Sequence, residues 1–219
     1  MIITIDGPAG SGKSTAARKL AAALEIPYLD TGAMYRAVAL KALQQVTPFD
    51  DPAALERVAR ETNIELNCGP THLRVVMDGH DVSEAIRSMR VSEHTSAVAR
   101  VQAIRDMLVE KQRQVAGRLG SLVTEGRDQG SVVFPDAEAK FLLLASDTKR
   151  AERRYHEMLA EGEEVAFADV LHNIRLRDKN DKPQWAPLLE PGKAIVIDTT
   201  RLTLAEVVDR MMEELSARQ

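Results

Sequence analysis

The segment from Gly7 to Ser14 constrains the fold of this chain more than any other part of the sequence. It reads GPAGSGKS and matches the pattern G-x-x-x-x-G-K-[ST] in full. Residues 1–6 before it are mostly β-branched and apolar, as in a buried strand, and a helical apolar pattern begins at Lys13. A strand, a glycine-rich loop and a helix in this order predict a site for the phosphates of a nucleoside triphosphate.

Nine consecutive residues are expected to form this phosphate site, with ATP as the nucleotide. Lys13 should reach the β- and γ-phosphates, Ser14 should contact Mg²⁺, and Thr15 should lie near the phosphates. The motif alone does not separate a kinase from a switch, a motor or a regulatory ATPase. The full set is Gly7, Pro8, Ala9, Gly10, Ser11, Gly12, Lys13, Ser14 and Thr15.

Strand and helix patterns alternate along most of the chain, which predicts an α/β fold with a mostly parallel sheet flanked by helices on both faces. The alternation breaks at about 52–87, where a helix after Asp51-Pro52 and two short strand-like runs predict a small α+β insert. Thr203 and Glu206 form a predicted capping box for the last helix. The expected strands are 1–6, 27–30, 121–125, 140–145 and 194–198, and the expected helices include 33–45, one long helix through Val98 and Val115, and 147–160.

Composition bounds the partners and the compartment. The chain has 219 residues and a formal net charge of −4, which argues against a general nucleic-acid binder that relies on a basic face. Cys68 is the only cysteine, so no internal disulfide can form. No apolar run is long enough to span a bilayer. We expect a cytoplasmic monomer that binds small-molecule nucleotides and neither nucleic acid nor membrane.

Three features near the expected carboxyl ends of strands suggest an acceptor for a phosphoryl group. Arg36 follows the strand at 27–30, and Arg127 with Asp128 follows the strand at 121–125. The basic run 175–182 lies in a polar segment and could supply cations to the transferring group. Each feature also has a plain structural reading: a solvated arginine, a turn-stabilising pair and a solvated charge run. Their co-occurrence with the phosphate loop favours a small kinase.

Together these residues closely resemble the bacterial-type cytidylate kinases. The matching segments cover nearly the whole chain in order, and DTGAMYR and GRDxGxVVFPDA are far more particular than the phosphate loop. They are IDGPAGSGKST (5–15), LDTGAMYRAVAL (29–40), DGHDVSEAIR (78–87), GRDQGSVVFPDA (126–137), RDKND (177–181) and APL (186–188).

The resemblance implies a P-loop NTPase fold in three parts and a set of roles. The core would be about 1–51, 88–160 and 188–219, the nucleotide-binding insert about 52–87, and the lid about 161–187. The acceptor would be bound by eight residues: Ser96, Arg105 and Asp128 look like cytosine readers with Thr31 in the same pocket, Arg36 and Arg127 look like phosphate contacts, and Arg177 and Asp181 look like lid residues. The expected catalytic residues are Lys13, Arg36, Arg127 and Arg177.

The expected reaction is therefore the transfer of the γ-phosphoryl group of ATP to CMP or dCMP, with Mg²⁺. Two departures from the family pattern bear on it. Gln129 stands where an apolar residue is usual. The family commonly has an arginine a few residues after the position of Asp181, whereas this chain has no arginine there and its nearest cation is Lys182. A polar lid with few apolar anchors would be open in the free protein. The alternatives are another small-molecule P-loop kinase, such as a shikimate-type enzyme, and a nucleotide-dependent regulator without turnover.

Overall fold

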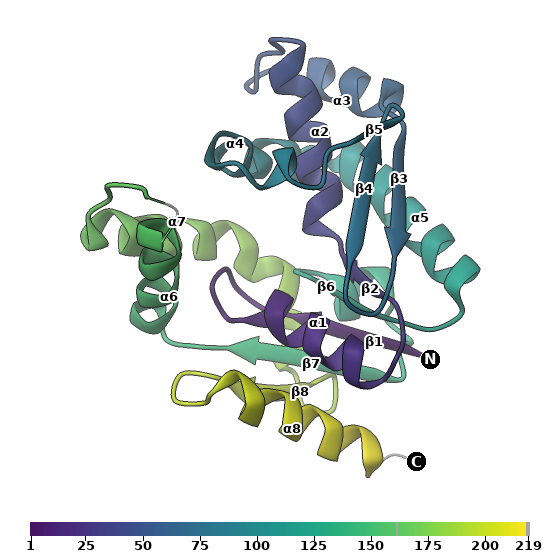
Figure 1. The fold of residues 1–219 in the computed structure, drawn as a ribbon, viewed down its shortest axis with the longest axis vertical. Coiled ribbons are helices and arrows are strands. Elements are labelled where there is room, and N and C mark those ends of the chain that lie inside the picture. The colour runs from purple at the N-terminus through teal and green to yellow at the C-terminus, as the bar shows by residue number, and fades with distance from the viewer. Residues whose placement is uncertain (161, 218–219) are drawn as a thin grey trace.

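Five parallel strands form the central sheet of the computed structural model, which describes residues 1–160 and 162–217. Their order is β2-β6-β1-β7-β8 (Figure 1). This arrangement confirms the predicted α/β fold. The strands are β1 (Ile2–Asp6), β2 (Tyr28–Asp30), β6 (Leu122–Gly126), β7 (Ala139–Leu144) and β8 (Ile195–Asp198).

Helices cover both faces of the sheet because successive strand residues point to opposite sides. Ile3, Ile5 and Phe141 pack against α1 (Lys13–Ala23) and α8 (Leu204–Ser216), which lie side by side in Figure 1. Leu29 and Leu122 belong to a second core on the side of α2 (Gly32–Gln44). The capping box at the start of α8 is confirmed, since Thr203 and Glu206 bond to each other's backbone N–H groups.

The segment 52–87 holds a helix and an antiparallel sheet of its own. Asp51 caps α3 (Pro52–Glu61) by accepting a hydrogen bond from the backbone nitrogen of Ala54 at 3.0 Å. The strands β3 (Ile64–Cys68), β4 (Leu73–Met77) and β5 (His80–Asp81) pair in order, and a short 3-10 helix, η1 (Ala85–Arg87), ends the segment. Val75 and Met77 of β4 share the core that includes α2, so the insert packs on that side of the sheet.

The single long helix expected through Val98 and Val115 is wrong. The chain forms α4 (Met89–Ala99) and α5 (Gln102–Leu119), and the backbone is extended between them at Val101, with ψ of 109°. The apolar spacing continues through the break because Val98 and Ile104 pack into the same core from different helices.

The expectation that the lid segment has few apolar anchors is also wrong. After α6 (Asp147–Ala160), the segment forms the long helix α7 (Phe167–Trp185), which a 3-10 helix, η3 (Ala186–Leu189), follows. Val170 and Ile174 pack on Ala151 at one end, and Trp185 packs on Leu142 of the sheet at the other. The predicted lid begins at residue 161, and the predicted core ends at 219; residues 161 and 218–219 lie outside the described residues.

Within those described ranges, no helix combines the length and the apolar character that crossing a membrane requires.

Candidate active site

A cleft of about 400 Å³ opens at the carboxyl ends of β1, β2 and β6. The chain leaves β1 toward β2 on one side and β6 toward β7 on the other, so the strand order reverses beside the phosphate loop. Ligands of open α/β sheets bind at such a point. The loop, α4, α5 and α7 enclose the cleft, and all eight residues expected to bind an acceptor line it: Thr31, Arg36, Ser96, Arg105, Arg127, Asp128, Arg177 and Asp181.

The phosphate loop has the backbone conformation that its glycines allow. Gly7 has a φ of +147°, and a Cβ there would lie 2.2 Å from the carbonyl oxygen of Leu143, so a side chain cannot be accommodated. The loop feeds directly into the N-terminus of α1, whose free N–H groups and dipole favour an anion. Six of the nine residues expected to bind nucleotide line the cleft: Ala9, Gly10, Gly12, Lys13, Ser14 and Thr15.

Lys13 is only 6% exposed and is held at the floor of the cleft. Its Nζ donates to the carbonyl oxygen of Pro8 at 3.2 Å and lies 4.0 Å from Oε2 of Glu125. Burial and the positive charge of Arg127 lower the pKa of Lys13 to about 7. An anion placed in the loop would reverse that shift.

Glu125 is a site residue to which the sequence reasoning gave no role. It lies at the end of β6 with almost no exposure, and its Oε1 accepts a hydrogen bond from the Ser14 hydroxyl at 2.7 Å. Burial and the neighbouring charge of Asp30 raise the pKa of Glu125. The signal available from sequence was a carboxylate at the last position of the predicted strand 121–125, next to the polar turn that begins at Gly126.

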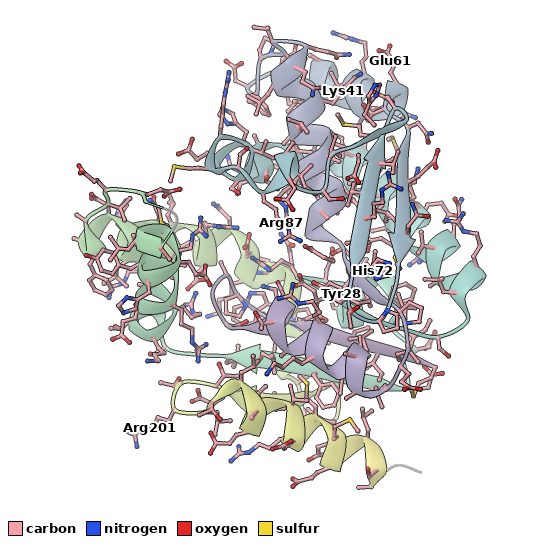
Figure 2. All side chains as sticks on the ribbon, in the orientation of Figure 1. Tyr28, Lys41, Glu61, His72, Arg87 and Arg201 are labelled. Atoms are coloured by element: carbon pink, nitrogen blue, oxygen red, sulfur yellow. The ribbon has the colours of Figure 1, made fainter. Side chains whose placement is uncertain are left out.

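Arg36 is fixed by its position one turn into α2. Its Nη2 lies 2.6 Å from Oδ2 of Asp30, and Oδ1 of Asp30 accepts from the backbone nitrogen of Ala33. Although burial opposes ionisation, the Arg36 guanidinium holds the pKa of Asp30 below its usual range. Arg87 at the end of η1, labelled in Figure 2, adds to this effect.

Arg105 and Asp128 line the same cleft and form an ion pair between α5 and the turn after β6. The turn continues as one stretch of π-helix, η2 (Gln129–Val133). Asp6 at the end of β1 supports it by accepting from the backbone nitrogens of Gln129 and Gly130, both at 2.7 Å. Burial raises the pKa of Asp6 to about 7. A planar guanidinium beside a carboxylate offers donors and acceptors in one plane, which suits the edge of a nucleobase.

Helix α7 brings two of its charged residues to the cleft. Oδ2 of Asp181 accepts from Nε of Arg127 at 2.9 Å. Arg177 is exposed toward the cleft, and within the described part of the chain it forms no ion pair. Partial desolvation and the charge of Arg127 lower the pKa of Arg177. Lys182 is exposed and does not line the cleft, whereas Gln184 does, so the structure does not put Lys182 in place of an arginine.

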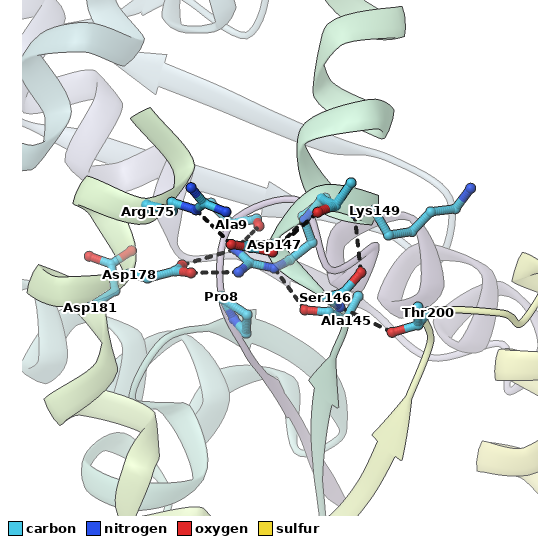
Figure 3. A network of polar contacts seen from close by, with 12 residues as sticks. Pro8, Ala9, Ala145, Ser146, Asp147, Lys149, Arg175, Asp178, Asp181 and Thr200 are labelled. Atoms are coloured by element: carbon cyan, nitrogen blue, oxygen red, sulfur yellow. Dashed lines mark hydrogen bonds and ion pairs between the residues drawn. The ribbon is translucent and has the colours of Figure 1, made fainter. Parts of the chain in front are cut away.

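Arg150 on α6 ties α7 to the phosphate loop. It is 4% exposed, pairs through both terminal nitrogens with the Asp178 carboxylate of α7, and donates to the carbonyl oxygen of Ala9 at 3.1 Å. Figure 3 shows Asp178, Ala9 and Ala145 converging on this point. Arg154, one turn further along α6, lines the cleft beside Arg177. The sequence reasoning treated α6 only as a charged helix and missed both arginines.

A phosphate loop, a buried lysine and several arginines therefore share one cleft with a pair able to read a planar ligand. This combination defines a P-loop kinase whose acceptor is small and anionic.

Comparisons with known proteins narrow the class. The cytidylate kinase family model matches residues 3–217. The cytidylate kinase of Caldanaerobacter subterraneus subsp. tengcongensis is 47% identical over 215 residues, which cover 97% of this chain and 93% of that protein. The cytidylate kinase of Pelotomaculum thermopropionicum is 46% identical over 217 residues, which cover 98% of this chain and 96% of that protein. The chain belongs to the cytidylate kinase family.

Solved structures share the fold at much lower sequence identity. A shikimate kinase from Acinetobacter baumannii, in complex with shikimate, superposes with a TM-score of 0.51 at 13% identity, over 100% of this chain and 94% of that one. This likeness concerns the fold alone.

Proposed function

We propose that this protein transfers the γ-phosphoryl group of ATP to CMP, giving CDP and ADP, and that it accepts dCMP as well. The observation that carries the proposal is one cleft lined both by the phosphate loop and by Arg36, Arg127 and the Arg105–Asp128 pair. Membership of the cytidylate kinase family supports the choice of acceptor. We infer that it acts as a cytoplasmic monomer.

Catalysis would be positioning and charge neutralisation. The attacking oxygen of the CMP phosphate is already anionic, so no side chain has to remove a proton. Arg36 and Arg127 would hold the acceptor phosphate, while Lys13 and Arg177 would offset the charge that develops on the transferring group. Because Arg36 and Arg127 are paired with carboxylates in the free protein, the incoming phosphate would displace or share these partners.

The residues beside the phosphate loop fit a Mg²⁺ ion bound with the nucleotide. Ser14 and Glu125 supply two oxygen atoms 2.7 Å apart, and oxygen is the ligand that Mg²⁺ prefers. Within the described residues, no group of three or more His, Cys, Asp or Glu side chains could hold a metal by itself, so ATP phosphates would complete the coordination. The ion, when bound, would neutralise phosphate charge.

We propose that α7 forms the main part of a lid over the cleft. Residues 161–187 would close over both nucleotides, 52–87 would border the acceptor, and the rest of the chain would form the core. Arg150 would transmit the position of α7 to the phosphate loop, because its guanidinium contacts both. Closure would bring Arg177 to the phosphates and exclude water.

The proposed function is tested by a coupled ADP-release assay over CMP, dCMP, UMP, AMP and shikimate. We expect CMP to give the highest kcat/KM. Turnover with shikimate and none with CMP would favour a different P-loop kinase, and the absence of ADP release with every acceptor would favour a non-catalytic nucleotide-binding protein.

Replacing Asp128 with asparagine should relax the choice of base. A carboxylate can only accept from the amino group of cytosine, whereas an amide can also donate to the carbonyl of uracil. We expect the CMP:UMP ratio of kcat/KM to fall at least about tenfold in Asp128→Asn, or about 1.4 kcal/mol. Asp136→Asn, at an exposed position outside the cleft, is the control. An unchanged ratio in Asp128→Asn would show that this carboxylate does not read the base.

ATP binding should take up a proton at mildly alkaline pH. With a pKa of about 7, Lys13 is mostly neutral in the free protein at pH 8, and bound phosphates should raise that pKa. Calorimetry in two buffers of different ionisation enthalpy should therefore show uptake approaching one proton at pH 8 and little at pH 6, where Lys13 is charged in both states. Uptake at pH 8 that persists in Lys13→Met would assign the proton to another group.

A further inference from the structure

Gln129 and Gln112 form a buried amide pair directly behind the proposed base pocket. Gln129 is 0% exposed and Gln112 is 1% exposed. Nε2 of Gln129 donates to Oε1 of Gln112 at 3.0 Å and lies 3.5 Å from the hydroxyl oxygen of Thr31. On its other side, Oε1 of Gln129 accepts from the Thr124 hydroxyl at 2.8 Å. Buried polar side chains are stabilising only when their partners are all in place. One of these partners, Thr31, lines the cleft.

One backbone carbonyl sets the direction of this hydrogen-bond chain. The Thr31 hydroxyl lies 2.8 Å from the carbonyl oxygen of Glu125, which can only accept, so Thr31 must donate there. The atom of Gln129 that faces Thr31 must then be the donating nitrogen. Its oxygen consequently faces Thr124, and Gln112 presents its oxygen to the same nitrogen.

Thr31, which lines the cleft, is therefore left with acceptor capacity alone. A ligand group that donates, such as an exocyclic amino group, can bond to this hydroxyl oxygen. A carbonyl at the same place would meet a second acceptor and remain unpaired, which is costly in a buried setting.

The amide pair is one of several links between α5 and the turn after β6, where Arg113 of α5 also donates to the carbonyl oxygens of Val132 and Val133. Arg105 and Gln112 are seven residues apart, two turns along one face of α5. Arg105 pairs with Asp128, and Gln112 pairs with the next residue of the turn, Gln129. Gly126 leaves room for this packing, because a Cβ there would lie 2.8 Å from the Thr31 hydroxyl oxygen and 2.9 Å from the Gln129 side chain.

We propose that the Gln112–Gln129 pair supports base specificity from behind the pocket, by positioning the Thr31 hydroxyl and fixing the turn that carries Asp128. The proposal rests on the proposed function, since it assumes a cytosine pocket at this place. Both glutamines are positioning residues: neither lines the cleft, and both act through Thr31 and Asp128.

The test compares Gln129→Met, Gln112→Met and the double variant, with kcat/KM for CMP and UMP, KM for ATP and the melting temperature of each. Methionine keeps the size of glutamine and removes its hydrogen bonds. We expect the CMP:UMP ratio to fall about tenfold in Gln129→Met and about threefold in Gln112→Met, with KM for ATP unchanged. The milder Gln112→Met keeps the Thr124–Gln129 bond, so it remains informative if Gln129→Met folds poorly.

The double variant separates positioning from stability. In the double variant no glutamine amide is left unpaired, although the buried Thr124 hydroxyl still loses its acceptor, so the melting temperature should recover only in part relative to Gln129→Met. The CMP:UMP ratio should nevertheless stay low, because Thr31 and the turn are no longer positioned. A ratio that returns with the melting temperature, or that stays within twofold of the natural chain in all variants, would overturn the proposal. A natural chain that does not phosphorylate CMP would instead overturn the proposed function.

Discussion

Lys13→Met should fold normally and lose at least about a thousandfold in kcat. The ammonium group is expected to touch the transferring phosphoryl group, where a preorganised charge acts in a desolvated site. Its removal should therefore lower kcat as well as affect KM. The variant should melt no lower than the natural chain, because methionine fits a long, buried side-chain site without the cost of desolvating a cation.

Lys19→Met is the matched control for this result. Lys19 lies on the same helix, but its side chain is exposed and does not line the cleft. Steady-state kinetics with CMP and thermal melts of both variants test the role of Lys13. Near-normal turnover in Lys13→Met would refute the assigned role of the phosphate loop. An equal loss of kcat in Lys19→Met would point to a general effect of removing charge from α1.

The parallel sheet and the phosphate loop could be predicted because their signals are local. GPAGSGKS needs a strand before it and a helix after it, and all three lie within the first 24 residues. Arg36, Arg127 and Asp128 were predicted from their places after strands, and Arg177 and Asp181 lie in the charged run 175–182, whereas Thr31, Ser96 and Arg105 came only from the family resemblance. Periodicity alone could not show that Ser96 on α4 and Arg105 on α5 meet Asp128 in one cleft.

The break between α4 and α5 escaped the sequence reasoning because one core receives both helices, so the apolar spacing is continuous while the backbone is not. The apolar anchors of α7 were missed for a different reason. Val170, Ile174 and Trp185 are spread through a highly charged segment, and their partners, Ala151 and Leu142, are distant in sequence.

Glu125 and Arg150 show what pattern reading leaves out. Each is a charged side chain in a segment that already had an ordinary explanation, the end of a strand for Glu125 and a charged helix for Arg150. Their roles depend on burial and on partners across the fold, Ser14 for one and Asp178 for the other. A departure from the family pattern was visible at Gln129, but its partners Gln112 and Thr124 were not.

Arg177→Ala should lower kcat on the order of a hundredfold while changing the melting temperature little. Its guanidinium lies in the cleft, exposed to solvent and without an ion pair among the described residues. It therefore contributes little to the stability of the free protein. Desolvation and the positive charge of Arg127 both lower the pKa of Arg177. Phosphates that enter the cleft would relieve this repulsion, and Arg177 would be neutralised by the group undergoing transfer.

Lys182→Ala provides the contrast on the same helix. Lys182 is exposed and turned away from the cleft lining, so its removal should leave kcat within about twofold, in the range of an ordinary surface substitution. The two variants remove one positive charge each from α7 and differ in where that charge lies. Single-turnover and steady-state rates with ATP and CMP give the comparison. Equal losses would mean that the net charge of α7 matters more than the position of Arg177. A fully active Arg177→Ala enzyme would show that Arg177 takes no part in the phosphoryl-transfer step.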